Sequence, residues 1–214
     1  MMTIYLIPGL GADHRLFNEL SIPGHRLKHI KLPVPVANQS MVSYAREIAT
    51  QIDPSEKFVL IGVSLGGMIS CELAYILNPY KVILISSAQC NREIPKLYKF
   101  QGRTGINRLI PGWIIKYSAV LLQGIFENDS WKDRKFFRKM ILAKPSVYYK
   151  RTVDMIVNWK RTDSNPNIIH IHGSGDRTLP YRLVKPHYTV KNGSHMMVYT
   201  RAGEINKILQ QLLA

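Results

Sequence analysis

Residues 61–68 have the sequence Ile61-Gly62-Val63-Ser64-Leu65-Gly66-Gly67-Met68, in which one serine stands between glycines. The apolar run at 58–61 predicts a strand before it, and apolar positions at helical spacing predict a helix after it. Gly-x-Ser-x-Gly between a strand and a helix is the pattern of a nucleophile elbow. A Cβ at Gly62 or Gly66 would collide with the neighbouring strand or helix. Ser64 is therefore predicted to lie on a strained turn, at the positive end of the helix dipole. The alternative is a glycine-rich turn with an incidental serine.

Two residues far downstream are the predicted partners of Ser64. A serine hydroxyl needs a base to remove its proton, and a carboxylate must hold that base in one tautomer. Asp176 and His195 each follow an apolar run in a glycine-containing loop. Loops at the carboxyl ends of parallel strands share one edge of a sheet, so distant residues can converge there. We therefore predict a triad of Ser64, Asp176 and His195.

Short apolar runs alternate with helical patterns along most of the chain. Strands are predicted at 3–7, 27–32, 58–61, 81–85, 167–171 and 188–190, and helices within 40–53, 68–77 and 202–213. Asp13, just after the first loop, is expected to cap a helix rather than to take part in catalysis. Alternating strands and helices imply a parallel sheet with right-handed crossovers.

The segment between residues 88 and 166 breaks this alternation and is predicted to contain helices only. Ser130 and Ser146 are candidate N-caps of two of these helices. Pro111-Gly112 interrupts a long apolar stretch, which predicts two shorter helices in place of one.

The same segment carries most of the positive charge. Between Asn91 and Asn165 there are 16 Lys and Arg against 6 Asp and Glu, a net charge of +10 out of +15 for the chain. Solvated helix faces explain this charge without a partner. An anionic acyl substrate or acyl carrier is one alternative, and a nucleic acid or a membrane surface is another.

Length and composition favour one intracellular domain with an insertion. The 214 residues suffice for one substantial core, and no linker divides them. The N-terminus enters strand-like sequence without a basic and then apolar leader, and no apolar run approaches membrane-spanning length. Cys71 and Cys90 form no spacing motif. We therefore expect a cytoplasmic protein.

Together these motifs resemble those of the α/β-hydrolase superfamily, specifically a serine hydrolase with a helical cap. The matching segments are Pro8-Gly9-Leu10-Gly11, Gly62-Val63-Ser64-Leu65-Gly66, Gly175-Asp176 and Gly193-Ser194-His195. The resemblance implies an α/β fold with a mostly parallel six-stranded sheet flanked by helices, the family's two leading strands being absent. Residues 1–88 and 166–214 would form the hydrolase core, and residues 89–165 the helical cap insertion.

The resemblance also implies an oxyanion hole made of two backbone N–H groups. Leu65 would supply one and the first loop the other, with Leu10 favoured over Gly9. The family usually has His-Gly where this chain has Pro8-Gly9. Because the donor is a main-chain group two residues later, we expect the hole to survive this departure. The family's rival position for the acid, at residues 86–89, holds no carboxylate, which favours Asp176.

The remaining histidines raise the question of a metal. His170 and His172 alternate on a predicted strand, but no third ligand stands at a recognisable metal spacing. Packing or hydrogen bonding at the strand end is therefore favoured, and no metal or cofactor is predicted. His14, beside the first loop, is a candidate pocket residue.

The function that the resemblance implies is hydrolysis of a small ester or related acyl compound through an acyl-serine intermediate. In that reaction Ser64 is the nucleophile, His195 the general base and then acid, and Asp176 the group that orients His195. Other chemistry of the family, such as C–C hydrolysis or a lyase reaction, is one alternative. A catalytically silent fold that serves as a binding module is the other. The substrate is expected to be a small acyl compound, with an anionic one as an option.

Overall fold

The structure, a computed structural model, describes the backbone of residues 1–126 and 131–214. It describes the side chains of residues 1–121 and 133–214. Six strands form one sheet: β1 (Thr3–Ile7), β2 (Arg26–His29), β3 (Phe58–Val63), β4 (Lys81–Ile85), β5 (Ile168–Gly173) and β6 (Tyr188–Val190). Their order is β2-β1-β3-β4-β5-β6, and every neighbouring pair is parallel. The predicted six-stranded parallel sheet is confirmed.

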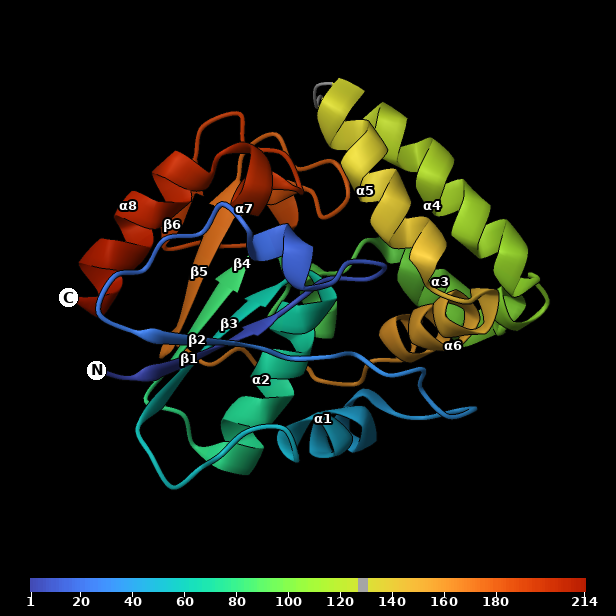
Figure 1. Cartoon of the computed structure of the whole chain (residues 1–214). Coiled ribbons are helices and arrows are strands. Elements are labelled where there is room, and N and C mark those ends of the chain that lie inside the picture. Colours follow the sequence, from blue (N-terminus) through green and yellow to red (C-terminus); the bar gives the residue numbers. More distant parts are fainter. Residues whose placement is uncertain (127–130) are drawn as a thin grey trace.

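Helices cover both faces of this sheet (Figure 1). The eight α-helices of the described residues are α1 (Met41–Ala49), α2 (Leu65–Leu77), α3 (Lys96–Thr104), α4 (Gly112–Phe126), α5 (Trp131–Ala143), α6 (Ser146–Val157), α7 (Met197–Thr200) and α8 (Ala202–Leu213). Helices α1 and α2 lie on one face of the sheet and α8 on the other. None of the helices in the described ranges is long and apolar enough to span a membrane.

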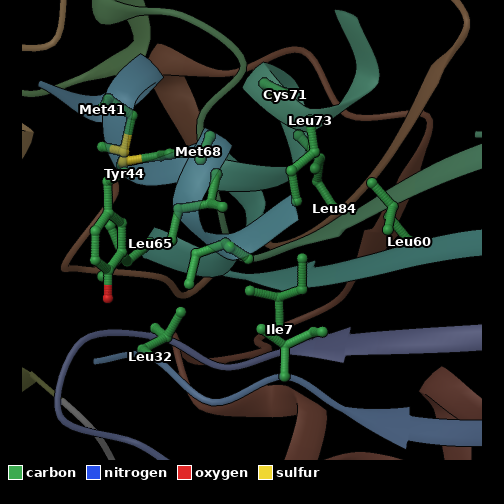
Figure 2. Packing of buried hydrophobic residues seen from close by; sticks show 14 of the residues in the cluster. Ile7, Leu32, Met41, Tyr44, Leu60, Leu65, Met68, Cys71, Leu73 and Leu84 are labelled. Atoms are coloured by element: carbon green, nitrogen blue, oxygen red, sulfur yellow. The ribbon is translucent and has the colours of Figure 1, made fainter. Parts of the chain in front are cut away.

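The two hydrophobic cores follow from the alternation of side chains along β1. Tyr5 and Ile7 belong to the cluster that α1 and α2 cover, whereas Ile4 and Leu6 belong to the cluster that α8 covers. Figure 2 shows part of the first cluster, in which Ile7 and Leu60 of the sheet and Leu65 and Met68 of α2 are labelled. Both faces of β1 and β3 are buried, which explains why these strands are continuous apolar runs rather than alternating ones.

The segment between β4 and β5 contains helices and no strand within its described residues. It comprises α3 to α6 with the short 3-10 helices η2 (Asn91–Glu93) and η3 (Ile106–Arg108), and it lies beside one end of the sheet (Figure 1). Pro111 directly precedes α4, so the predicted break of the apolar stretch is confirmed. The division into a core (1–88 and 166–214) and a cap (89–165) stays a prediction, and residues 89–165 are called the insertion below.

The predicted helix caps have mixed outcomes. Asp13 caps the 3-10 helix η1 (His14–Phe17), since its carboxylate accepts the N–H of Arg15. The prediction for Ser146 is wrong: it is the first residue of α6, and Pro145 occupies the cap position without a side-chain hydrogen bond. Ser130 lies outside the described residues.

A buried ion pair ties the end of the insertion to the core. The Glu72 carboxylate of α2 is buried and accepts hydrogen bonds from Arg161 Nη2 at 3.0 Å and from Trp159 Nε1 at 2.7 Å. Both donors lie in the segment that leads from α6 to β5. The segment that carries the chain back into the sheet is therefore held against α2.

Candidate active site

Ser64 stands alone between β3 and α2 in a strained backbone conformation. Its φ and ψ are 53° and −118°, a region that residues other than glycine rarely adopt. A Cβ on Gly62 would collide with the carbonyl oxygen of Gly66, and a Cβ on Gly66 would collide with that of Ile7. The predicted reason for both glycines is thus confirmed: helix α2 excludes a side chain at one position and strand β1 at the other.

Two hydrogen bonds from the end of β4 hold this turn. The N–H of Ser64 donates to the carbonyl oxygen of Ile85 at 3.1 Å, and Ser87 Oγ donates to the carbonyl oxygen of Ser64 at 2.6 Å. Both bonds use only the main chain of Ser64. The backbone around it therefore holds the strained conformation, and the Ser64 side chain is left for other contacts.

The structure brings Ser64, His195 and Asp176 together. Ser64 Oγ lies 2.9 Å from His195 Nε2, and His195 Nδ1 lies 2.8 Å from Asp176 Oδ2. Asp176 follows β5 and His195 follows β6, so both occupy loops at the carboxyl edge of the sheet. The hydroxyl can donate to Nε2 while Nδ1–H donates to the carboxylate, which is the arrangement of a nucleophile, a base and an orienting acid.

Asp176 is 4% exposed, yet its surroundings favour the ionised form. The N–H groups of Thr178 and Leu179 donate to Oδ1 at 2.9 and 2.8 Å. Burial by itself raises the pKa of this carboxyl, but His195, His172 and the Leu179 N–H outweigh burial and hold the pKa below its ordinary value. Asp176 therefore faces His195 Nδ1 as a carboxylate.

His172 also contacts Asp176, which the sequence did not predict. His172 Nε2 lies 2.9 Å from the carbonyl oxygen of Leu179 and 3.3 Å from Asp176 Oδ2. A carbonyl only accepts, so this nitrogen carries the proton, and His172 Nδ1 accepts from His170 Nε2 at 3.1 Å. Burial lowers the pKa of His172, and it lowers the pKa of His170 to about 3, so both rings are neutral.

The two histidines therefore act through hydrogen bonds and packing. The sequence favoured this interpretation over a metal site, and the hydrogen bonds of both rings support it. In the described residues no cluster of three His, Cys, Asp or Glu side chains could hold a metal ion. His14 lies exposed on η1 and is not among the residues that line the cavity described below.

The first loop packs directly against Ser64. A Cβ on Gly9 would lie 3.2 Å from Ser64 Cβ. The loop turns through a bond from Ala12 N–H to the Gly9 carbonyl oxygen at 3.1 Å, with Gly11 at φ 75° in the position where a type II turn needs a positive φ. This bond does not use the N–H of Leu10.

Two backbone N–H groups are thus available near the serine. Leu65 is the first residue of α2, so its N–H has no partner within the helix, and the N–H of Leu10 lies outside the turn's own hydrogen bond. Both residues line one cavity together with Ser64 and His195. The geometry is compatible with the predicted oxyanion hole, whose role stays a prediction.

A cavity of about 650 Å³ lies over Ser64 and His195. Its walls come mainly from the insertion and are mostly apolar; they include Ile94, Leu97, Tyr98, Ile110, Ile114, Ile115, Ala119, Phe137, Met140, Ile141, Val153, Ile156 and Val157. Arg177 is the one charged side chain that the described residues contribute besides the titratable ring of His195. The basic residues of the described part of the insertion do not line it. The sequence missed these wall residues because an apolar stripe does not tell whether it faces a core or a cavity.

Comparison with known structures supports the fold. The chain is similar to a thermophilic esterase from Thermogutta terrifontis (TM-score 0.76, 16% identity, 100% of this chain and 89% of that one). It is also similar to a hydrolase from Pseudomonas aeruginosa PA01 (TM-score 0.75, 13% identity, 100% and 90%). An esterase from Exiguobacterium antarcticum matches with TM-score 0.72 and 14% identity over 99% and 91%. At these identities the likeness shows the fold alone.

Sequence comparison identifies the family. Among curated protein sequences none matches this chain significantly. The model of the alpha/beta hydrolase family, by contrast, matches residues 4–208, which is nearly the whole chain. This match includes the turn at Ser64, the insertion, and the later loops that carry Asp176 and His195. The chain therefore belongs to the alpha/beta hydrolase family.

Proposed function

We propose that this protein is a serine hydrolase that cleaves an ester of an apolar acyl group. The observation that carries the proposal is the chain of contacts from Ser64 Oγ through His195 to Asp176 on a strained elbow. The family supports a hydrolase, and esterases are among the proteins of similar fold. The contacts also argue against a catalytically silent binding module, because such a module needs no aligned base.

The proposed reaction has two halves. Ser64 Oγ attacks the carbonyl carbon of the ester while its proton passes to His195 Nε2. The tetrahedral intermediate collapses, the C–O bond to the alcohol breaks, and His195 returns the proton to the leaving oxygen. Water then enters, gives a proton to His195 and attacks the acyl-serine carbonyl carbon. The bond from that carbon to Ser64 Oγ breaks, His195 returns the proton to Oγ, and the carboxylic acid is released.

The developing oxyanion would be stabilised by the N–H groups of Leu65 and Leu10. Three features support this: the position of Leu65 at the start of α2, the tight packing of the first loop against Ser64, and the helix dipole that faces the serine. Gly11 lies against α6, since a Cβ there would lie 2.6 Å from Tyr149 Oη. Tyr149 in turn donates to the Ile141 carbonyl oxygen at 2.7 Å. The insertion thus supports the loop that carries one donor.

The apolar walls of the cavity support an uncharged hydrocarbon chain as the acyl group. Its volume of about 650 Å³ falls within the range that binds small organic ligands. A carboxylate placed there would lose its hydration, and the cations in the described part of the insertion do not line the walls. Steering of anionic substrates by those cations stays a prediction. A cytoplasmic location likewise stays part of the proposal; Cys71 and Cys90 are both free and buried, as a reducing compartment allows.

The acyl chain length is the direct test of this substrate class. Each buried methylene contributes about 0.8 kcal/mol, or about a fourfold gain, so kcat/KM is expected to rise about 100-fold or more from acetyl to octanoyl esters. Ala119→Phe should remove most of that gain because Ala119 lines the cavity. The measurement is kcat/KM over a series of p-nitrophenyl esters.

The matched control is Ala143→Phe, since Ala143 is an exposed residue at the end of α5. It should leave the chain-length series unchanged. A flat series, or an equal loss in both variants, would contradict the apolar acyl site. A carboxylate-bearing ester that outperforms its neutral counterpart at low salt would favour the anionic alternative.

His172 is expected to support catalysis through Asp176. Replacing it with phenylalanine removes the Nε2–H that donates to the carbonyl oxygen of Leu179, whose own N–H holds Asp176. A buried carbonyl left without its donor costs about 1.5 kcal/mol or more, and the loosened loop should lower kcat about 10-fold with little change in KM. Loss of the polar ring beside Asp176 Oδ2 should also raise the pKa of that carboxyl, and a more basic carboxylate holds the His195 proton more tightly, so the acid limb of the kcat/KM profile should move to higher pH. His172→Gln should restore part of the rate. The control is His187→Gln. His187 is exposed and accepts the backbone N–H of His170, and its replacement should leave the pH profile unchanged.

A further inference from the structure

Three large apolar side chains remain exposed on one face of α4, and a fourth, Leu109, is exposed three residues before the helix begins. Leu109 is 81% exposed, Trp113 58%, Tyr117 53% and Leu121 71%. The last three are four residues apart on α4, so they share one face of that helix. None of the four lines the cavity over Ser64. We call these four residues the outer apolar stripe.

The opposite side of α4 is apolar as well. Ile115, Ser118 and Ala119 line the cavity, so the helix has one side toward the cavity and its other side toward solvent. A helix that is apolar on both sides is normally buried on both. A contiguous exposed apolar surface of this kind marks a site of contact with a partner or a membrane.

Positive charge lies next to the outer apolar stripe. Helix α5 packs against α4, and the two run side by side (Figure 1). Its exposed residues include Arg134, Lys135, Arg138 and Lys139. From residue 92 to residue 121 the sequence adds six Lys and Arg against one acidic residue, Glu93, which is half-buried and accepts the Gln89 N–H. The surface is therefore complementary to an anionic partner.

We propose that the outer apolar stripe and the cations of α5 form a docking surface for an anionic lipid membrane. Trp and Tyr favour the interface between headgroups and acyl chains, and Leu side chains enter the acyl boundary. Lys and Arg beside them are attracted to anionic headgroups. A second copy of this chain is disfavoured as the partner, because a two-fold contact would bring the cations of two α5 helices together.

The cavity opens at this surface. Leu97 and Ile114 both line the cavity and are exposed, so its apolar wall continues to the outside of the insertion. An acyl chain that leaves the lipid layer there would meet apolar side chains from the surface to Ser64. This transfer rests on the proposed function, whereas docking itself does not.

The experiment measures vesicle binding by the Ser64→Ala protein, which leaves lipid esters intact. We expect it to sediment with vesicles that contain phosphatidylglycerol, and much less with pure phosphatidylcholine or in about 0.5 M NaCl. Adding Trp113→Ser and Leu121→Ser should weaken binding about 10-fold or more. Adding Arg138→Gln and Lys139→Gln instead should weaken binding to the anionic vesicles by a similar factor.

The matched control compares Tyr117→Ser with Tyr80→Ser. Both tyrosines are 53% exposed, but Tyr80 precedes β4 at the opposite end of the strand from the site. Only Tyr117→Ser should weaken binding, and the stripe variants made on active protein should hydrolyse a soluble butyryl ester normally.

Absence of binding to anionic vesicles, or equal binding by stripe and control variants, would overturn the proposal. A dimer that breaks apart in the stripe variants would also overturn it. So would binding of an acidic protein to the outer apolar stripe without any binding of vesicles. If the active protein hydrolysed no ester while Ser64→Ala still bound vesicles through the stripe, docking would stand and the proposed function would fail.

Discussion

Replacing Ser64 with alanine is expected to lower kcat/KM for an octanoyl ester by about 10⁴-fold or more. The variant lacks the oxygen that attacks the ester, and no other group of the site can take its place. The fold should persist because the hydrogen bonds that hold the elbow use only the main chain of residue 64. The measurement combines ester kinetics with thermal unfolding.

The matched control is Ser118→Ala, which removes a hydroxyl from the same cavity in α4. It should retain activity within a few-fold, because Ser118 Oγ is bonded to the Ile115 carbonyl oxygen of its own helix. Residual activity of Ser64→Ala near that of Ser118→Ala would remove Ser64 from the mechanism.

The second large effect is expected for Asp176→Asn, with a loss on the order of 10⁴-fold in kcat. The amide oxygen can still accept the N–H groups of Thr178 and Leu179, so the loop should keep its shape. The amide nitrogen, however, would face His195 Nδ1 with hydrogens and favour the tautomer that carries its proton on Nε2. In that tautomer His195 cannot accept the proton of Ser64.

Asp163→Asn is the control for a lost carboxylate. Asp163 is an exposed residue that accepts Tyr75 Oη–H and pairs with Arg161, away from the cavity. Its replacement should change kcat little. A severe loss in Asp163→Asn together with near-normal turnover in Asp176→Asn would require a different acid.

The elbow and the strands could be predicted because local patterns determine them. The apolar run before Gly62, the two glycines and the helical spacing after them each depend on neighbours in the sequence. The approach of Asp176 and His195 to Ser64 followed from topology alone, since all six strands are parallel and their loops share one edge. The last strand and the last helix have the predicted bounds, Tyr188–Val190 and Ala202–Leu213.

Other parts of the site could not be predicted because they depend on packing between distant elements. Whether Met140 or Ile156 faces a core or a cavity is decided by how α5 and α6 lie over the sheet. The contact of His172 with Asp176 depends on the path of the loop after β5, which brings Leu179 back to the strand end. Ser146 resembled an N-cap in sequence, but Pro145 already begins the turn there.

The account depends on Ser64 as the residue that becomes acylated, and active-site labelling tests this most directly. A fluorophosphonate reacts with a serine only where a base removes its proton and donors stabilise the developing charge. Intact protein treated with such a reagent should gain one adduct, which peptide mass spectrometry should locate on Ser64, and Ser64→Ala should gain none. An adduct on another serine, or undiminished labelling of Ser64→Ala, would contradict the account.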